Sequence, residues 1–181
     1  MANQPVYLRP HDVCVALQLV IVPGADFRSL ARQVGVSLGE AHNSVGRLQS
    51  AHLVLPHRRE ANRRSLLEFV MYGVPYSFPG ELGAETLGVP TAHSGPAFRD
   101  RIAAADIIVW PSSRGKERGV SLVPLCPAAP DMINENPQLY RWLTAVDVLR
   151  VGRARERKLA REILEPELRA SSADLFDAAG S

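Results

Sequence analysis

Residues 26–48 contain two short runs of apolar residues at helical spacing, joined by a tight turn. The apolar stripe of the first run consists of Leu30, Ala31 and Val34. Asp26 is a suitable N-cap for this run, and Gly35 follows it where a helix ends in a left-handed residue. Ser37 and Glu40, three residues apart, have the spacing of a capping box. The pattern therefore predicts two helices separated by a sharp turn.

The second run, residues 37–50, has one apolar and one polar side. The positions that we expect to face the interior are Leu38, Ala41, Val45 and Leu48. The positions that we expect to face outward are Gly39, Glu40, His42, Asn43, Gly46 and Arg47. Ala31 and Gly35 are small enough to let the two helices cross closely, as a helix-turn-helix requires when its second helix enters a DNA major groove. DNA binding is the leading interpretation.

The remaining pattern predicts further helices on both sides of this motif and short strands between them. Helices are expected at residues 10–22, 65–72, 96–105, 137–150 and 153–164. Strands are expected at residues 76–78, 86–89, 107–110 and 120–123, the last two as arms of a hairpin around SSRGKERG. Gly73 is expected to end one helix, and Pro166 to end or kink another because it lacks an amide donor.

Composition and charge are those of an ordinary globular protein with one basic region. The 181 residues are 46% hydrophobic, and a formal net charge of only +2 argues against a polycation that coats nucleic acid indiscriminately. Within residues 1–65, however, eight arginines stand against four acidic residues. Such a local excess of positive charge is what phosphate contacts require.

Several classes of protein are disfavoured by what the sequence lacks. Cys14 and Cys126 are the only cysteines, too few for a metal site or a disulfide framework. The longest apolar run, residues 13–22, is too short to span a bilayer, and the N-terminal sequence has no apolar leader. We therefore expect a cytoplasmic protein without a membrane segment or cofactor.

Base contacts are expected from the polar side of the second motif helix. In a major groove asparagine pairs bidentately with adenine and arginine with guanine, each worth roughly 1–3 kcal/mol of discrimination. Asn43 and Arg47 are therefore the first candidates, with His42 beside them. Ser37, which caps the helix, and Gly39, which permits close backbone approach, complete the expected set. The alternative is that this side is simply exposed to solvent.

Phosphate contacts are expected from arginines on the first motif helix and just after the second. The first helix supplies Arg28 and Arg32, and the stretch HRREANRR supplies Arg58, Arg59, Arg63 and Arg64. Several such contacts make binding fall steeply with salt concentration. The alternative is a solvated helix start whose arginines pair with Glu60 and Glu68.

Several residues of DFRSLARQVGVSLGEAHNSVGRLQSAHLV stand at positions typical of one family: Leu30-Ala31, Gly35-Val36-Ser37, Val45, Leu48 and Leu53-Val54. Residues 10–55 thereby resemble the winged-helix regulators of the MarR type. The resemblance implies a dimeric DNA-binding protein whose second motif helix reads the major groove beside a β-hairpin wing. The chain departs from that pattern after Leu55, where no obvious two-stranded wing follows. The wing is either delayed to residues 76–89 or absent.

Together these elements predict an α+β fold: an N-terminal winged helix-turn-helix, a small β-rich middle and a C-terminal helical pair. The expected regions are 1–73 for DNA binding, 74–135 as a β-rich wing or extension, 136–169 as C-terminal helices for dimerisation, and 170–181 as a mobile tail. Asp147 lies among apolar residues of the third region, where we expect Arg150 or Arg153 to neutralise it.

Enzymatic chemistry is only weakly indicated. Residues 91–94 place His93 beside Ser94, but no third partner stands at a suggestive spacing and no nucleophile elbow surrounds the serine. The stretch SSRGKERG lacks P-loop spacing and is not followed by a helix. We therefore expect no enzymatic activity.

Two functions remain open for the whole chain. The first is a transcriptional regulator that binds double-stranded DNA as a homodimer. The second is an antitoxin or immunity-type protein that autoregulates its operon and binds a protein partner, such as a toxin, through residues 74–169.

Overall fold

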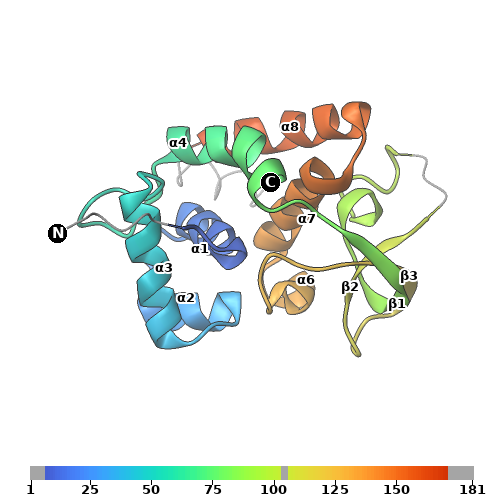
Figure 1. The fold of residues 1–181 in the computed structure, drawn as a ribbon, viewed down its shortest axis with the longest axis horizontal. Helices are drawn as coiled ribbons and strands as arrows, with labels where there is room; N and C mark the ends of the chain where they lie inside the picture. The colour runs from blue at the N-terminus through green and yellow to red at the C-terminus, as the bar shows by residue number, and fades with distance from the viewer. Residues whose placement is uncertain (1–6, 103–105, 171–181) are drawn as a thin grey trace, which may run out of the picture.

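Helices form most of the structure, a computed structural model that describes residues 7–102 and 106–170. They gather around two buried helices, α1 (Pro10–Ile21) and α7 (Pro137–Val151). A small three-stranded sheet lies at one end of the molecule, and helices α2 (Phe27–Val34) and α3 (Leu38–Ser50) lie at the other (Figure 1). The fold is therefore α+β, as the sequence predicts.

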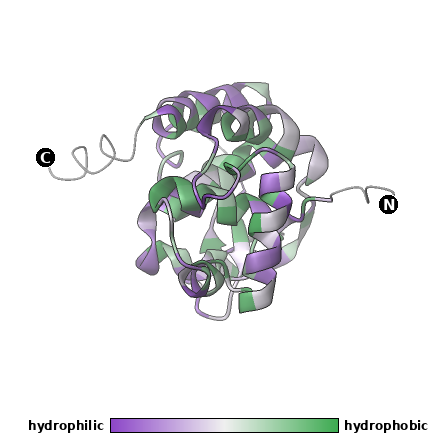
Figure 2. Ribbon diagram, turned by 90° about the vertical axis from the view of Figure 1, so that its left-hand side faces the viewer, coloured by the Kyte–Doolittle hydropathy of each residue, from purple (hydrophilic) through white to green (hydrophobic). Residues whose placement is uncertain are grey.

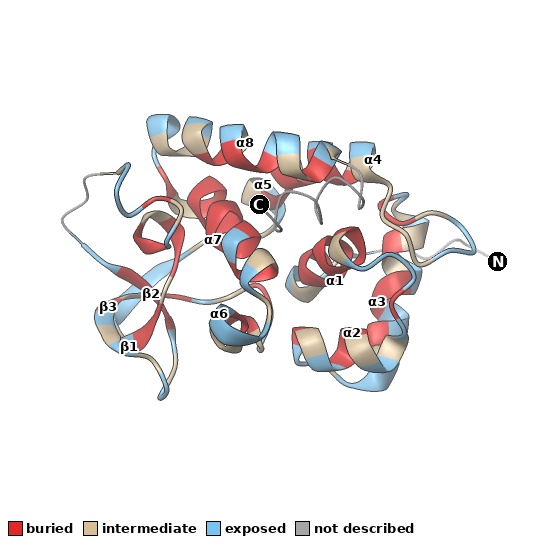
Figure 3. Ribbon diagram, turned by 180° about the vertical axis from the view of Figure 1, so that it is seen from behind, coloured by how far each residue is buried: buried red, intermediate tan, exposed pale blue. Residues whose placement is uncertain are grey.

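Helix α1 is central because it is apolar on almost every side. Pro10 occupies its first turn, and the helix is buried from Asp12 to Val20. Helix α7 packs against it, and both helices are largely buried (Figure 3). The buried apolar residues form one continuous cluster through the helical motif, the sheet and the C-terminal helices. The three predicted regions therefore do not have separate cores.

The caps of α2 and α3 form largely as predicted. The N–H of Ser29 donates to Asp26 Oδ1 at 2.9 Å, and Gly35 turns the chain with a left-handed backbone (φ 77°, ψ 36°). The N–H of Glu40 donates to Ser37 Oγ at 3.1 Å. The capping box is nevertheless only half formed, because the Glu40 carboxylate turns away to neighbouring basic side chains.

The burial of α3 follows the predicted sides with three exceptions, one of which is Glu40, expected to face outward but with a side chain only 21% exposed. Ala41, Val45 and Leu48 are buried, and His42 and Asn43 are exposed. Leu38, expected to face inward, is 54% exposed. Arg47, expected to face outward, has a side chain that is only 16% exposed.

After α3 the chain turns back on itself in a short hairpin over residues 53–62. Val54 pairs with Ala61 in a single antiparallel bridge, and the N–H of Leu55 donates to Glu60 O at 2.9 Å. His57, at the tip, has a left-handed backbone (φ 57°). The hairpin contains one isolated bridge and no strand, so residues 53–62 form no two-stranded sheet.

One continuous helical run follows: α4 (Arg63–Glu68), the π-helical turn η1 (Phe69–Gly73) and α5 (Val74–Ser77). Two predictions are wrong here, since Gly73 does not end the helix and residues 76–78 form no strand. The Phe69 ring lies against Gly73 so closely that a Cβ there would be 2.4 Å from Phe69 Cδ2. The glycine therefore makes room for the Phe69 ring within the π-helical turn.

The sheet consists of β1 (Leu82–Pro90), β2 (Ile108–Pro111) and β3 (Glu117–Leu122). Strand β1 pairs antiparallel with β2 near one end and with β3 along the rest, so β2 and β3 run parallel and the three strands close on themselves. The predicted hairpin of residues 107–110 and 120–123 is therefore wrong. Gly88 makes this closure possible, because a Cβ there would lie 2.1 Å from Trp110 O.

Short helical turns replace one predicted helix and join the sheet to α7. Residues 96–101 form turns after the 3-10 helix η2 (Ala92–Ser94), and the helix predicted at residues 96–105 is not formed; residues 103–105 lie outside the described residues. After β3 the chain forms the 3-10 helix η3 (Ala129–Asp131) and α6 (Met132–Glu135).

Helix α8 (Ala154–Arg169) is longer than predicted and continues through Pro166. Gly152 separates it from α7, as expected. Leu164 and Leu168 are buried on either side of the proline, so apolar packing holds the helix together past the missing amide. Residues 171–181 of the predicted tail lie outside the described residues.

A buried polar cluster joins α7 to the sheet. Trp110 Nε1 donates to Asp147 Oδ2 at 2.6 Å, and Thr91 Oγ1 donates to the same oxygen at 2.7 Å. Arg150 Nη1 donates to Asp147 Oδ1 at 2.6 Å, which confirms the predicted pairing with Arg150. Burial raises the pKa of Asp147, and the Arg150 charge opposes that rise.

Candidate nucleic-acid interface

The candidate interface is the end of the molecule formed by α2, α3 and the hairpin of residues 53–62 (Figure 2). Four of the residues expected on the outer side of α3 are exposed: Gly39, His42, Asn43 and Gly46. They share one side of the helix because they recur at spacings of three and four residues. Ser37, also exposed, caps the start of α3.

Arg47 does not join this exposed set, because its guanidinium turns inward to Asp12 on α1. Arg47 Nε lies 2.8 Å from Asp12 Oδ2, and Arg47 Nη2 lies 2.7 Å from Asp12 Oδ1. Ser44 Oγ donates to the same carboxylate at 2.5 Å. The Asp12 side chain is only 1% exposed, so this bidentate pair is largely withdrawn from water. The expectation that Arg47 reads a base does not fit its position.

Glu40 and His11 extend this pair into a cluster of opposite charges. Arg47 Nη2 donates to Glu40 Oε1 at 2.6 Å, His11 Nε2 lies 2.9 Å from the same oxygen, and Arg9 Nη1 donates to it at 3.1 Å. The hydrogen bond from Arg47 lowers the pKa of Glu40, and the bond to Asp12 raises the pKa of Arg47. We name Arg9, His11, Asp12, Glu40, Ser44 and Arg47 the α1–α3 clamp.

The clamp fixes how α3 is turned on the body of the protein. Its members come from the start of α1 and from one side of α3, so its hydrogen bonds resist rotation of α3 about its own axis. The exposed side of α3, which adjoins the clamp residues on the helix surface, is thereby presented in one orientation. Sequence reasoning missed this role, although an acidic residue at position 12 of an otherwise apolar helix was the available signal.

Arg59 ties the hairpin to the loop between α1 and α2. Its Nε donates to Ala25 O at 2.8 Å, and its guanidinium lies 5.1 Å from the centre of the Phe27 ring. The N–H of Gly24 donates to Arg59 O at 2.7 Å, so backbone and side chain both join the two segments. His42 on α3 packs against the same Phe27 ring in a tilted arrangement, with 4.8 Å between ring centres and 38° between ring planes.

A small cavity of about 200 Å³ lies between α3 and the hairpin. Its walls include His42, Gly46 and Gln49 from α3, and His57 and Arg58 from the hairpin tip. Gln49 Nε2 donates to the carbonyls of Leu55 at 3.3 Å and Arg58 at 3.1 Å, which holds the hairpin beside the helix. Helix and hairpin therefore form one surface.

The six arginines expected to contact phosphate fall into two groups. Arg28, Arg32, Arg58 and Arg64 are exposed, the last two beside Glu60 and Glu68 in ion pairs of 3.8 and 3.6 Å. Arg63, in contrast, donates to the carbonyls of Val20, Leu168 and Ala170, and so joins α4 to the end of α8. Arg59 is occupied as described above. Arg63 is therefore placed to stabilise the fold rather than to contact phosphate.

The other candidate chemistry is not assembled. Ser94 Oγ accepts from the N–H of Ile108 at 2.9 Å, and His93 Nε2 lies 2.8 Å from Asp106 O, so the two side chains serve backbone groups. Among residues 7–102 and 106–170, no group of three or more His, Cys, Asp or Glu is placed to hold a metal ion. Cys14 and Cys126 are both buried and unbridged.

In the described part of the chain, no helix combines the length and apolar character needed to cross a membrane. Comparison with known proteins gives no matching family model, no similar curated protein and no similar solved structure.

Proposed function

We propose that this protein binds specific sequences of double-stranded DNA as a transcriptional regulator, with α3 in the major groove. The observation that carries the proposal is the exposed polar side of α3, held in one orientation by the α1–α3 clamp and flanked by basic residues of α2 and the hairpin. A major groove is wide enough to admit one α-helix.

The order of elements supports this proposal. Three helices are followed by a hairpin that lies beside the last of them, and Gly24 in the first loop pairs with Arg59 on the returning arm of the hairpin. In a winged helix-turn-helix the second motif helix enters the major groove and the wing lies next to it. The proposal thus agrees with the MarR-type resemblance of residues 10–55.

Asn43 is the residue that we assign to base readout. Its side chain is exposed near the middle of the outer side of α3, and asparagine matches the N6 and N7 groups of adenine. His42 is restrained by its contact with Phe27, which orders it next to Asn43. Gly39 and Gly46 have no atoms within 4 Å of an added Cβ, so both leave open space for a phosphate or base to approach.

Phosphate contacts are assigned to Arg28 and Arg32 on α2 and to Arg58 at the hairpin tip. All three are exposed, on the two elements that flank α3. Arg64, exposed on α4 after the hairpin, is assigned a peripheral contact. Each phosphate contact makes the slope of log affinity against log salt concentration more negative by about 0.9.

We propose a homodimer whose contact surface includes α5, η1 and α8. Tyr72 and Tyr76, one helical turn apart, are 65% and 79% exposed. Arg161 of α8 lies 5.4 Å from the centre of the Tyr72 ring. Exposed tyrosine and arginine are typical of protein–protein contacts. The same surface would also suit contact with a different protein, which is what the second candidate function, an antitoxin or immunity protein, requires.

The proposal is tested by selection from a random duplex library, followed by fluorescence anisotropy of the full chain with the selected duplex. We expect an enriched sequence with two related half-sites, since a dimer places two copies of α3 on the duplex. DNA binding would be contradicted if the folded protein enriched no sequence and if its affinity for a mixed-sequence duplex did not fall with salt concentration.

A further inference from the structure

A groove follows one side of α8, away from the candidate nucleic-acid interface. Two cavities of about 820 and 380 Å³ form it, and Arg101 lines both of them. The larger cavity lies beside the start of α8, and the smaller one beside Ile163 of the same helix. The turns of residues 96–102 form the other wall. We name the two cavities together the α8 groove.

The α8 groove is separate from the contact that we assign to the homodimer. Leu159 lines the groove, whereas Arg161 lies against the Tyr72 ring. Successive residues of an α-helix are about 100° apart, so two residues place these side chains on nearly opposite sides of α8. A ligand in the groove therefore leaves the proposed dimer surface free.

The floor of the α8 groove is apolar. It is lined by Ile102, Leu159 and Ile163. Ile163 is buried, and the other two are partly buried and pack against the core. Such a floor suits the apolar side chains of an extended segment.

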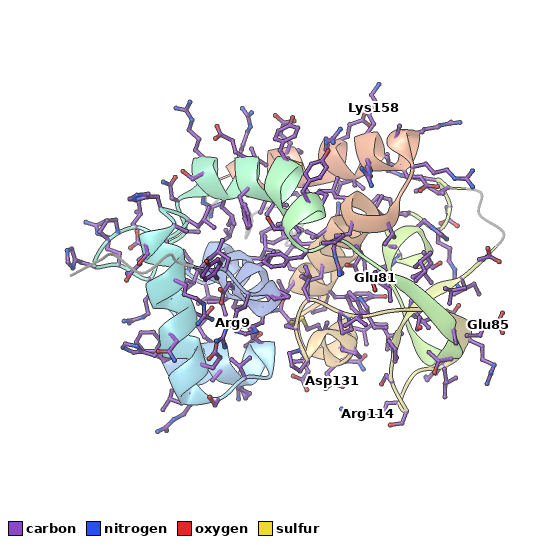
Figure 4. The ribbon with its side chains drawn as sticks, viewed as in Figure 1. Arg9, Glu81, Glu85, Arg114, Asp131 and Lys158 are labelled. Atoms are coloured by element: carbon purple, nitrogen blue, oxygen red, sulfur yellow. The ribbon has the colours of Figure 1, made fainter. Side chains whose placement is uncertain are left out.

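The rim of the larger cavity is basic. It is formed by Arg101, Arg153, Arg155 and Lys158. None of the four forms an ion pair with a residue that the structure describes, and Lys158 projects outward from α8 (Figure 4). Of the two acidic residues in this cavity, Glu156 accepts the N–H of Arg153 at 2.8 Å and so caps the helix. The groove therefore calls for acidic groups beside an apolar body.

Residues 174–177 of the chain have this composition. Their sequence is Asp-Leu-Phe-Asp, so two large apolar residues stand between two acids. Residues 170–181 contain no lysine or arginine that the basic rim would repel. Residues 1–6, in contrast, contain no acidic residue. Charge thus favours residues 174–177 over the other end of the chain.

The length of chain after α8 is sufficient to reach the groove. From Ala170 back to Leu159 the helix is about 17 Å long, at 1.5 Å per residue. The six residues from Ala170 to Phe176 span up to about 20 Å when extended. Phe176 can therefore reach Leu159 of the same molecule.

We infer that the α8 groove binds residues 174–177 of the same chain. Leu175 and Phe176 contact the apolar floor, and Asp174 and Asp177 pair with the basic rim. Exposed ion pairs are individually weak, but a short connection gives a segment an effective concentration on the order of millimolar. The bound segment covers a basic surface that would otherwise attract polyanions. This inference does not depend on DNA binding.

The inference is tested in the full chain with benzoylphenylalanine in place of Phe176. Irradiation should join position 176 to residues 153–163 or 96–102, as mapped by mass spectrometry. In an equal mixture of isotopically heavy and light protein, each crosslinked product should carry one isotope only, because both of its parts belong to one molecule.

Two pairs of substitutions test the role of charge. Arg155→Gln with Lys158→Gln should lower the yield of this crosslink by about threefold or more, since two ion pairs are lost. Arg28→Gln with Arg32→Gln removes the same charge from exposed positions of α2 and should leave the yield unchanged.

The crosslinking experiment overturns the inference in any of four cases. Position 176 may form no crosslink, or crosslink only to residues outside the groove. Crosslinks that mix the two isotopes would place the segment on a second copy instead. An equal loss of yield in both pairs of variants would remove the basic rim from the contact.

Retention on immobilised heparin, a polyanion, gives a second measurement. Asp174→Asn with Asp177→Asn should uncover the basic rim and shift elution to higher salt. Glu81→Gln with Glu85→Gln removes the same charge from exposed residues at β1 and should shift elution less (Figure 4). Equal shifts would show that the two aspartates do not cover the rim, and would overturn the inference.

Discussion

Two buried aspartates, Asp12 on α1 and Asp147 on α7, each bind an arginine, yet their surroundings differ. Both side chains of the Asp147 pair are buried, since that of Arg150 is only 6% exposed. The other hydrogen bonds of Arg150 go to the carbonyls of Phe78 and Val123. In the Asp12 pair the carboxylate is buried, but the Arg47 side chain is 16% exposed and also contacts Glu40, which His11 contacts as well, near the surface.

The difference separates a pair that joins parts of the core from a pair that orients a surface helix. Asp147 connects α7 to Thr91 and Trp110, so it holds the sheet on the helical region. Asp12 connects the start of α1 to Ser44 and Arg47 of α3, which adjoin the side of α3 that we propose to contact DNA. Loss of the first should therefore affect stability alone, and loss of the second should affect stability and DNA binding together.

The largest expected effect is that of Asp147→Leu. Removal of the carboxylate leaves the buried guanidinium of Arg150 and the indole N–H of Trp110 without their acceptor, which should lower the free energy of unfolding by about 3–5 kcal/mol. Urea unfolding measures this loss. Asp147→Asn keeps an acceptor oxygen and should cost less. A loss below about 1 kcal/mol for the leucine variant would show that the cluster is not a main support of the fold.

Arg47→Ala should come next, with a loss of about 3 kcal/mol of unfolding free energy, because Asp12 is left buried without its partner. The same variant should bind the selected duplex more weakly, since α3 is no longer held in one orientation. Arg32→Ala removes an exposed arginine from α2 and should change stability by less than about 0.5 kcal/mol. Equal stability of the two variants would contradict the clamp.

Asn43→Ala should change DNA recognition while leaving stability unchanged. It should remove roughly 1–3 kcal/mol of preference at one base position. Anisotropy against single-base variants of the selected duplex measures this. Asn134→Ala, which removes an exposed asparagine from α6 outside the candidate interface, is the matched control. An unchanged preference in the Asn43 variant would remove this residue from base readout.

Arg58→Ala should weaken binding to all duplexes by a similar factor and make the salt slope shallower by about 0.9, because one phosphate contact is lost. Anisotropy over a series of salt concentrations gives the slope. Arg155→Ala removes an exposed arginine from α8 and should leave the slope unaltered. If both variants keep the parent slope, the hairpin tip does not contact phosphate.

The smallest effect concerns pH. The pKa of Glu40 is lowered in the folded protein from its ordinary value of 4.5, mainly by the hydrogen bond from Arg47. Stability from this group is therefore complete above that ordinary value and is lost as pH falls through the lowered pKa. Urea midpoints below pH 4.5 should fall more steeply for the parent than for Glu40→Gln. Parallel profiles would show that the clamp does not perturb Glu40.

Local signals made the helical motif predictable. Asp26, Gly35 and Ser37 act through neighbours three or four residues away, so their roles follow from spacing alone. The exposure of Asn43 follows in the same way. Helices α1 and α7 were predictable because their apolar character persists over three turns or more.

Long-range contacts set the features that were missed. Arg47 binds Asp12, 35 residues away, and Arg63 binds the carbonyl of Leu168, more than 100 residues away. Nothing near either arginine in the sequence distinguishes it from an exposed arginine. The parallel arrangement of β2 and β3 depends on β1 pairing with both, which spacing between two strands does not reveal. The sequence around Gly73 has the usual mark of a helix end, yet packing of Phe69 overrides it.

The most direct test of the central claim is a photo-crosslink from the exposed side of α3. With benzoylphenylalanine in place of Asn43, irradiation in the presence of the selected duplex should join protein to DNA, and the same photoreactive residue in place of Lys158 on α8 should not. Crosslinking at both positions, or at neither while the duplex stays bound, would contradict the placement of α3 in the groove.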